Sequence, residues 1–407
     1  MLDCAVHPIC VLSCRTPPED EVTALTDSAG AGEHLQAALR RVRSVAADTG
    51  VAGVVLTAPG PVAWVTGGLN QPIDRTAAVD VVWLAVSADG ACVITTEVEA
   101  PRLAAEYGLD ALGLDLIAVP WWDAPAFVEA ATKFVGRSAD ALGTDGHPAF
   151  GVDLGVALTR ERLALDPWEQ GRLRELGQDA ADAVETALRE WEPGEPDRDV
   201  AARIAAAVEW VGAQAPVLLV GGDDRLRRFR HPVAVGQPLH EVVMAVLVAA
   251  RDGQHVALTR YVAAHPLDRP GDHELTEGLD AVRRIHRRTL AASQPGATTA
   301  DVLAELADAY VSEGAAGAWS QHYQGGPIGY AQREFEVAPG QVDSAYWSTP
   351  LPEGSAVAWN PSLPGGAKDE DTFLVRAGVP EPVTLTTQWP LADDLLPARP
   401  AVLVLGL

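Results

Sequence analysis

Lysine and methionine are scarce in this chain of 407 residues. Its only lysines are Lys133 and Lys368, so nearly all of its 30 basic residues are arginines, and it has two methionines. Acidic residues number 56, which gives a formal net charge of −26. Nucleic-acid binding requires a basic face that displaces counterions from phosphates, and an anionic membrane surface repels an acidic protein. The composition therefore indicates neither nucleic acid nor membrane as a partner.

Long apolar runs are also absent. The longest, Val242–Ala250, has the length of a strand, whereas a transmembrane helix requires about 20 apolar residues. The first residues, MLDCAVHPICVLSCR, lack the basic start and the apolar stretch of a signal peptide. The sequence thus predicts a cytoplasmic protein.

Cysteine is rare and unevenly placed. Three of the four cysteines, Cys4, Cys10 and Cys14, precede the first expected helix, with His7 among them. Their spacing fits no standard zinc pattern, so we expect a reduced N-terminal segment in preference to a metal cluster. Cys92 lies in the apolar stretch ACVITT and is expected in the core of a strand.

The pattern of apolar residues predicts an N-terminal segment and two domains. Residues 1–32 form the segment. Residues 33–158 alternate expected strands with helices, which is typical of an α/β domain with a parallel or mixed sheet. Residues 159–407 instead combine helix pairs with antiparallel strands, an α+β pattern.

An internal repeat organises this second domain. Pro193 and Gly194 precede an Asp-Val pair at 199–200, and Pro295 and Gly296 precede another at 301–302, an offset of 102 in each case. Each motif joins two expected helices, the second of which we expect to be capped near Asp197 or Asp199 in the first copy. Strands follow each pair, so the sequence predicts two halves related by a pseudo-twofold, and sites commonly lie between such halves.

Four features together resemble a known family. They are AWVTG in the first domain, the duplicated helix units, HYQGGPIGY near residue 325, and NPSLPGGAKDEDTFLV near residue 365. They resemble the creatinase/aminopeptidase P/prolidase family, related to the M24 peptidases. The resemblance implies a pita-bread C-terminal domain with a pseudo-twofold repeat behind a creatinase-like α/β N-terminal domain, and a homodimer.

Most members of that family carry two metal ions on five ligands: two Asp, one His and two Glu. Matched motif by motif, these positions are here Val246, Ala257, Gly326, Asn360 and Glu370. One carboxylate and one amide are insufficient for two divalent ions. We therefore expect no metal and no cofactor.

The family also includes metal-free hydrolases such as creatinase, so we considered His231, His322 and Glu370 as catalytic candidates. His231 lies near the position of the creatinase acid/base, and neighbouring arginines are expected to lower its pKa. His322 precedes the double glycine and lies on a loop whose backbone can approach a ligand closely. Which histidine is the base stays open. Each one could also be structural, and Glu370 could belong to an ion pair.

Further polar residues are expected to contact a substrate. They are Tyr323, Gln324, Arg333, Glu334, Asn360, Lys368, Arg260 and Arg75. Lys368 and Glu370 share a face because residues i and i+2 of a strand point the same way, and Asp371 would point away. Arg333 either binds a substrate carboxylate or neutralises Glu334 and Glu370. Arg260 lines the cavity or pairs with an acid, and Arg75 would reach the partner's site across a dimer.

The sequence therefore favours a metal-independent, creatinase-like enzyme in bacterial specialised metabolism. Its expected substrate is a small molecule derived from an amino acid. Hydrolysis of a C–N bond, with water activated by histidine and oriented by Glu370, is the expected reaction. A lyase, dehydratase or cyclase would use the same groups. The other alternative is a non-catalytic pseudopeptidase that binds a peptide or a protein.

Overall fold

The computed structural model describes residues 29–69 and 73–407. The hypothesis about Cys4, Cys10 and Cys14 therefore lies outside the described residues. Cys92 is fully buried in the core, as its apolar neighbours predicted, and burial raises the pKa of its thiol to about 12. No helix in the described ranges is both long enough and apolar enough to cross a membrane.

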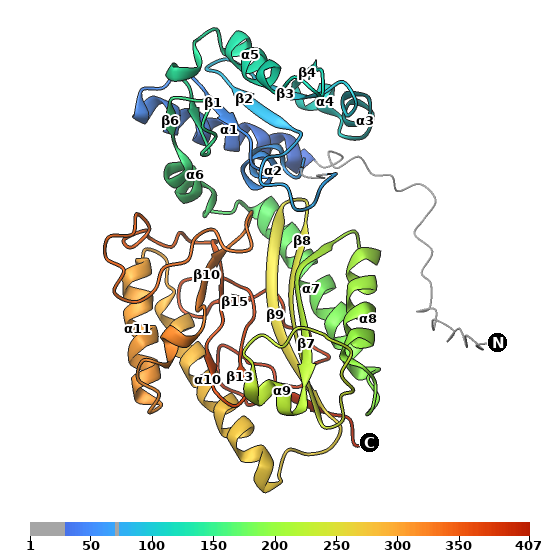
Figure 1. Ribbon diagram of the computed structural model, residues 1–407. Coiled ribbons are helices and arrows are strands. Elements are labelled where there is room, and N and C mark those ends of the chain that lie inside the picture. The colour runs from blue at the N-terminus through green and yellow to red at the C-terminus, as the bar shows by residue number, and fades with distance from the viewer. Residues whose placement is uncertain (1–28, 70–72) are drawn as a thin grey trace, which may run out of the picture.

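The N-terminal domain is a six-stranded mixed sheet with helices on both faces (Figure 1). The strand order is β4-β3-β2-β1-β5-β6, with antiparallel pairs in the centre and parallel pairs toward both edges. This confirms the α/β prediction. The helices are α1 (Ala29–Thr49), α2 (Pro59–Thr66), α3 (Ala100–Glu106), α4 (Leu109–Leu112) and α5 (Ala124–Val135). The strands are β1 (Val54–Leu56), β2 (Trp83–Val86), β3 (Ala91–Thr96), β4 (Asp115–Val119), β5 (Gly143–Thr144) and β6 (Val152–Asp153). Helix α6, Gly155–Arg162, spans the expected domain boundary between residues 158 and 159.

The C-terminal domain places two helix pairs on the outside of its strands (Figure 1). The pairs are α7 (Pro167–Arg189) with α8 (Asp197–Trp210), and α10 (His273–Ala292) with α11 (Thr299–Ser312), and the short α9 is Asp223–Arg228. One sheet has the order β16-β9-β8-β7, with β7 (Gln214–Gly222), β8 (Val242–Arg251), β9 (Gln254–Ala263) and β16 (Val402–Val404). A second has the order β10-β11-β14-β15, with β10 (Gly325–Ile328), β11 (Ala356–Trp359), β14 (Phe373–Leu374) and β15 (Glu381–Pro382). The hairpin of β12 (Ser362–Leu363) and β13 (Ala367–Lys368) completes the domain.

The helix pairs follow the repeat seen in the sequence. Helix α8 begins at residue 197 and α11 at residue 299, the same offset of 102 as the Pro-Gly motifs. The bridges Pro196↔Pro238 and Thr298↔Pro350 also start at equivalent positions. The expected cap of α8 was wrong. The N-cap is Pro196, and the buried carboxylate of Asp197 instead accepts from Arg225 and from backbone N–H groups.

A two-residue turn aligns the strands that carry the candidate site. Asp252 and Gly253 both have positive φ, at 51° and 83°, as the tight hairpin turn between two twisted strands requires. Arg251 therefore pairs with Gln254, and the register continues to place Val246 opposite Thr259. Because side chains alternate along a strand, Thr259 and the following Arg260 point to opposite faces of the sheet.

Glycine is required at the start of β10 by close packing against β11. A Cβ at Gly325 would lie 2.1 Å from the carbonyl oxygen of Ala358, and φ there is +77°. Gly326 has φ +152°, a backbone conformation that L residues with a side chain rarely adopt. The double glycine thus lets the backbone of β10 pack closely against the backbone of β11.

Candidate functional site

The site is centred on Glu370, a carboxylate that is only 1% exposed. Its Oε1 accepts from Arg333 at 2.9 Å and from the amide of Asn360 at 3.2 Å. Its Oε2 accepts from the hydroxyl of Thr259 at 3.3 Å and lies 3.3 Å from Nζ of Lys368. Burial raises the pKa of Glu370, but the charges of Lys368 and Arg333 outweigh burial and leave the pKa below its usual value. The carboxylate is therefore ionised and held by two cations.

Lys368 is the cation most affected by this arrangement. Its side chain is 5% exposed, and burial together with the charge of Arg333 lowers its pKa below the usual lysine value, against the opposing effect of Glu370. The placement of Lys368 and Glu370 on one face agrees with the i, i+2 prediction. Asp371 points the other way, as expected, and accepts from Arg260 and from Arg399.

Two histidines lie beside this ion cluster. The ring centroids of His231 and His322 are 4.9 Å apart, and the ring of Tyr323 stacks near His231 at 6.4 Å. Partial loss of hydration and then the charge of Lys368 lower the pKa of His231, with a smaller contribution from Arg230. The expected direction was right, but the arginine is not its main cause. Burial, Lys368 and His231 lower the pKa of His322 to about 3.

The tautomer of His322 follows from its one hydrogen bond. Nδ1 faces the carbonyl oxygen of Tyr323 and must donate, so Nε2 of the neutral ring carries a lone pair. That Nε2 is buried and has no hydrogen-bond partner among the described residues. Oδ1 of Asn360 is likewise buried and unpartnered. Buried polar atoms usually have a hydrogen-bond partner, so these two atoms are available to a water or a ligand.

The sequence missed two contributors to this cluster. Thr259 follows Ala257 by two residues, so the alternation of β9 already indicated that its hydroxyl shares the face of that expected ligand position. Arg230 directly precedes His231, and its guanidinium donates to Oγ of Ser362 and to Gln321. Adjacency to a candidate histidine was the available signal.

Arg260 does not line this site. It is fully buried on the opposite face of β9, where it donates to Glu185 and Asp371 at 2.9 Å each. Of the two expected roles, pairing with an acid is therefore the one observed. Strand alternation is the reason, because Thr259 already faces Glu370.

Gln324 and Glu334 have no free polar atoms to offer a substrate. Gln324 accepts from the hydroxyl of Tyr310 at 3.0 Å and donates to two loop carbonyls. Glu334 accepts from Arg162 at 2.6 Å and from the N–H of Tyr330 at 2.7 Å. Both hold the loop in shape, so the expected substrate contacts and the expected neutralisation of Glu334 by Arg333 are not what the geometry shows.

Arg75 also lies outside the group around Glu370. It is 54% exposed and pairs with Glu209 of α8 in the cleft between the two domains. Tyr323, 69% exposed, lies at the rim beside His231. The structure thus brings together His231, His322, Tyr323, Arg333, Asn360, Lys368 and Glu370.

A model of Metallopeptidase family M24 matches residues 171–377, which is half of the chain. The chain belongs to this family. A search of curated proteins found no significant match.

Solved structures share the fold over most of this M24 chain. A dipeptidase PepE from Mycobacterium ulcerans is 21% identical, with a TM-score of 0.69 over 87% of this chain and 96% of that one. An Xaa-Pro dipeptidase from Bacillus anthracis is 19% identical, with a TM-score of 0.64 over 86% and 98%. The N-terminal domain of FACT complex subunit SPT16 from Eremothecium gossypii is 13% identical, with a TM-score of 0.59 over 88% and 97%. These likenesses confirm the pita-bread architecture behind an N-terminal domain.

The name of the family implies metal ions, but the residues at the expected ligand positions offer few donor atoms for them. Val246, Ala257 and Gly326 offer no side-chain ligand atom, and Asn360 offers only a neutral amide. The remaining carboxylate, Glu370, already lies between an ammonium and a guanidinium, which repel a divalent cation. These residues do not fit a dinuclear centre.

One other group of potential metal ligands lies at the domain junction. Ligand atoms of His34, Asp166 and Glu169 lie within 4.8 Å of one another. They already serve another purpose: Asp166 and Glu169 form the capping box of α7, and the two nitrogens of His34 contact Asp166 and the carbonyl of Trp64. Both ring nitrogens therefore face acceptors, which favours imidazolium and accords with a raised pKa of His34 despite its burial.

Proposed function

We propose that this M24 chain is a metal-independent enzyme that hydrolyses a C–N bond in a small molecule derived from an amino acid. The observation that carries the proposal is the cluster around the buried Glu370: two neutral histidines beside its ion pairs with Lys368 and Arg333, with unpartnered polar atoms on His322 and Asn360. Ionisable groups with perturbed pKa values concentrate at functional sites. The family membership supports a hydrolase in general, and the residues at the expected ligand positions favour chemistry without metal.

Each group has a role that its surroundings support. His231 is accessible to solvent and less perturbed than His322, so it is the better proton acceptor for an attacking water. The lone pair on Nε2 of His322 orients that water or an N–H of the substrate. The oxygen of water bonds to the substrate carbon while its proton passes to His231. The C–N bond then breaks as the ammonium of Lys368 protonates the leaving nitrogen. We expected Glu370 to orient the water, but protein groups occupy both of its oxygens, so we assign it the positioning of Lys368 and Arg333.

The test is hydrolysis in the presence of a chelator. Purified protein is incubated with small amidines, amides and dipeptides, and the released amine is measured by mass spectrometry. We expect turnover that His231→Ala reduces by at least about 100-fold, the usual contribution of a general base. His273→Ala, an exposed histidine at the start of α10, is the matched control and should have no effect.

Turnover that disappears with the chelator and returns with divalent metal would contradict the metal-free mechanism. Equal activity of the His231 and His273 variants would remove His231 from the base position. The pH profile adds a separate check: activity should rise with pH through the pKa of His231, which lies below the usual histidine value.

The alternative is a binding module without catalysis. One observation favours it: both oxygens of Glu370 are already occupied by four protein groups, which leaves the carboxylate no open position. In that case a small ligand would stabilise the protein thermally, but no substrate in the panel would be consumed.

A further inference from the structure

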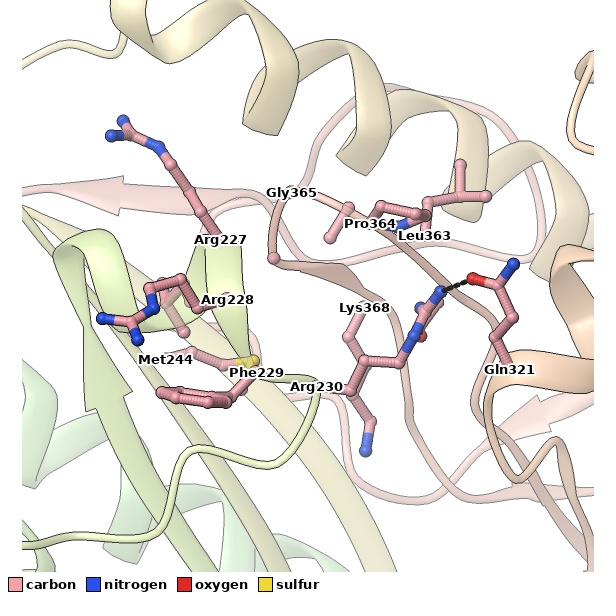
Figure 2. Close-up of a pocket in the computed structure, with 14 residues that line it drawn as sticks. Arg227, Arg228, Phe229, Arg230, Met244, Gln321, Leu363, Pro364, Gly365 and Lys368 are labelled. Carbon is pink, nitrogen blue, oxygen red and sulfur yellow. Dashed lines mark hydrogen bonds between the residues drawn. The ribbon is translucent and has the colours of Figure 1, made fainter.

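A pocket of about 160 Å³ lies between α9 and the β12–β13 hairpin (Figure 2). One wall is the end of α9 and the segment after it, including Arg228, Phe229 and Arg230. The facing wall is the β12–β13 hairpin, which contributes Lys368, and Gln321 closes one side. In Figure 2 the guanidinium of Arg230 turns toward Gln321, to which it donates at 2.9 Å.

Two arginines of this pocket, Arg228 and Arg230, lack the acids that neutralise its other basic residues, because Arg227 pairs with Asp224 and Lys368 with Glu370. Arg230 is half-buried, yet it donates hydrogen bonds to the neutral oxygens of Ser362 and Gln321. In the described part of the chain neither Arg228 nor Arg230 forms an ion pair, and Arg228 lies over the ring of Phe229 at 5.2 Å. By contrast, the neighbouring Arg225 pairs with Asp197 at 2.7 Å.

The ion cluster next to the pocket adds positive charge. Lys368 and Arg333 share the single carboxylate of Glu370, so these three groups carry one net positive charge. Arg230 adds a further positive charge to this local excess. A chain with 56 acidic and 30 basic residues has ample carboxylates to neutralise such groups. A half-buried guanidinium left without one is costly unless an anion from outside completes it.

The pocket is continuous in sequence with the histidines. Arg230 directly precedes His231, Gln321 directly precedes His322, and Lys368 pairs with Ser362 across the hairpin. Lys368 lines the pocket and its charge also lowers the pKa of both histidines, so a molecule held here by its anion lies near the two rings.

We propose that this pocket is the subsite for an anionic group of the substrate, a carboxylate or a phosphate, with Arg230 as its principal contact. The inference rests on the proposed function, because it names the substrate class of the same site. A guanidinium offers parallel N–H donors that match the oxygens of either anion, and the small volume suits one such group on a short stem. Arg228, an exposed residue that also lines the pocket, supplies a second positive charge.

The experiment is calorimetric titration of the full chain with inorganic phosphate and, separately, with acetate, at constant ionic strength in sodium chloride. We expect saturable binding of at least one anion. Arg230→Gln keeps an amide for Gln321 and Ser362 but removes the charge, and should weaken binding at least about tenfold. Arg230→Lys restores charge without the planar fork and should recover part of the affinity.

Arg284→Gln is the matched control, because Arg284 is an arginine of α10, 54% exposed and paired with Glu313. It should bind within about twofold of the wild type, well below one tenfold step in affinity. Thermal unfolding checks that Arg230→Gln is folded. Preference for phosphate identifies a phosphate-bearing substrate, and equal or better binding of acetate identifies a carboxylate. Equal weakening by the two glutamine variants, or no binding of either anion, overturns the proposal.

Failure of this inference and failure of the proposed function give different results. Anion binding that depends on Arg230, without turnover of any tested compound, keeps the subsite and refutes the hydrolase. Histidine-dependent turnover of uncharged amides, without anion binding, keeps the hydrolase and refutes the subsite.

Discussion

The contact between Lys368 and Glu370 gives the sharpest energetic prediction. The two charges lie 3.3 Å apart, with side chains 5% and 1% exposed. At an effective dielectric constant of about 20 their attraction is on the order of 5 kcal/mol. Removing Glu370 alone, by Glu370→Gln, leaves the buried Lys368 and the partly buried Arg333 without a counter-charge and should cost about 3 to 5 kcal/mol.

A double-mutant cycle isolates this pair. Lys368→Met should cost less than Glu370→Gln, because Arg333 still neutralises Glu370 at 2.9 Å. The double variant leaves one unpaired cation instead of two, so its cost should fall below the sum of the single costs by about 2 kcal/mol or more. The assay is urea unfolding at 25 °C and pH 7.5, followed by circular dichroism.

The exposed pair Arg75–Glu209, with side chains about half exposed, is the control cycle, and its coupling should stay below about 1 kcal/mol. Additive costs for Lys368 and Glu370, within about 0.5 kcal/mol, would refute the claim that these charges stabilise each other in a buried cluster.

Three further outcomes are expected. Burial raises the pKa of Glu169 to about 7, above its unfolded value, so the folded protein binds this proton more tightly than the unfolded chain does. The free energy of unfolding should therefore fall by on the order of 3 kcal/mol as pH rises from about 4.5 to above 7. In urea unfolding, Glu169→Gln should flatten that pH dependence. An unchanged slope would contradict the assignment. Gly325→Ala would place a Cβ 2.1 Å from a carbonyl oxygen and should lower the free energy of unfolding by about 3 kcal/mol or more. Gly314→Ala, at φ +72° with nothing within 4 Å, should cost about 1 kcal/mol in the same assay. Similar costs for the two variants would show that the loop relaxes around the added methyl group. Chelator treatment should leave the thermal unfolding midpoint unchanged, and two bound metal ions per chain by mass spectrometry would disprove the ligand assignment at Val246, Ala257, Gly326 and Asn360.

Much of the fold was predictable because it depends on local patterns. The repeat of Pro-Gly motifs, 102 residues apart, reappears as the two helix pairs. The Asp-Gly pair at 252–253 forms a hairpin turn because its two positive φ values suit those residue types. Helix α2 was not predicted, because its residues are buried nearly all round and have no amphipathic period.

Within the site, the sequence identified the residue types and the alternation of their side chains. It put Lys368 and Glu370 on one face and Asp371 on the other, and the contacts follow that pattern. The same rule applied to Thr259 would have excluded Arg260 from the cavity. The absence of ligand atoms at the expected metal positions was also a property of the sequence alone.

Only the tertiary structure decided which charges meet. Arg333 contacts Glu370 and leaves Glu334 to Arg162, although Glu334 is its neighbour in the chain. Arg230 is left with neutral partners while Arg225, five residues earlier, finds an acid. The reason is physical: a charge pairs with whatever packing brings within a few ångströms of it, and burial by distant segments sets both the strength of that pair and the pKa of its members.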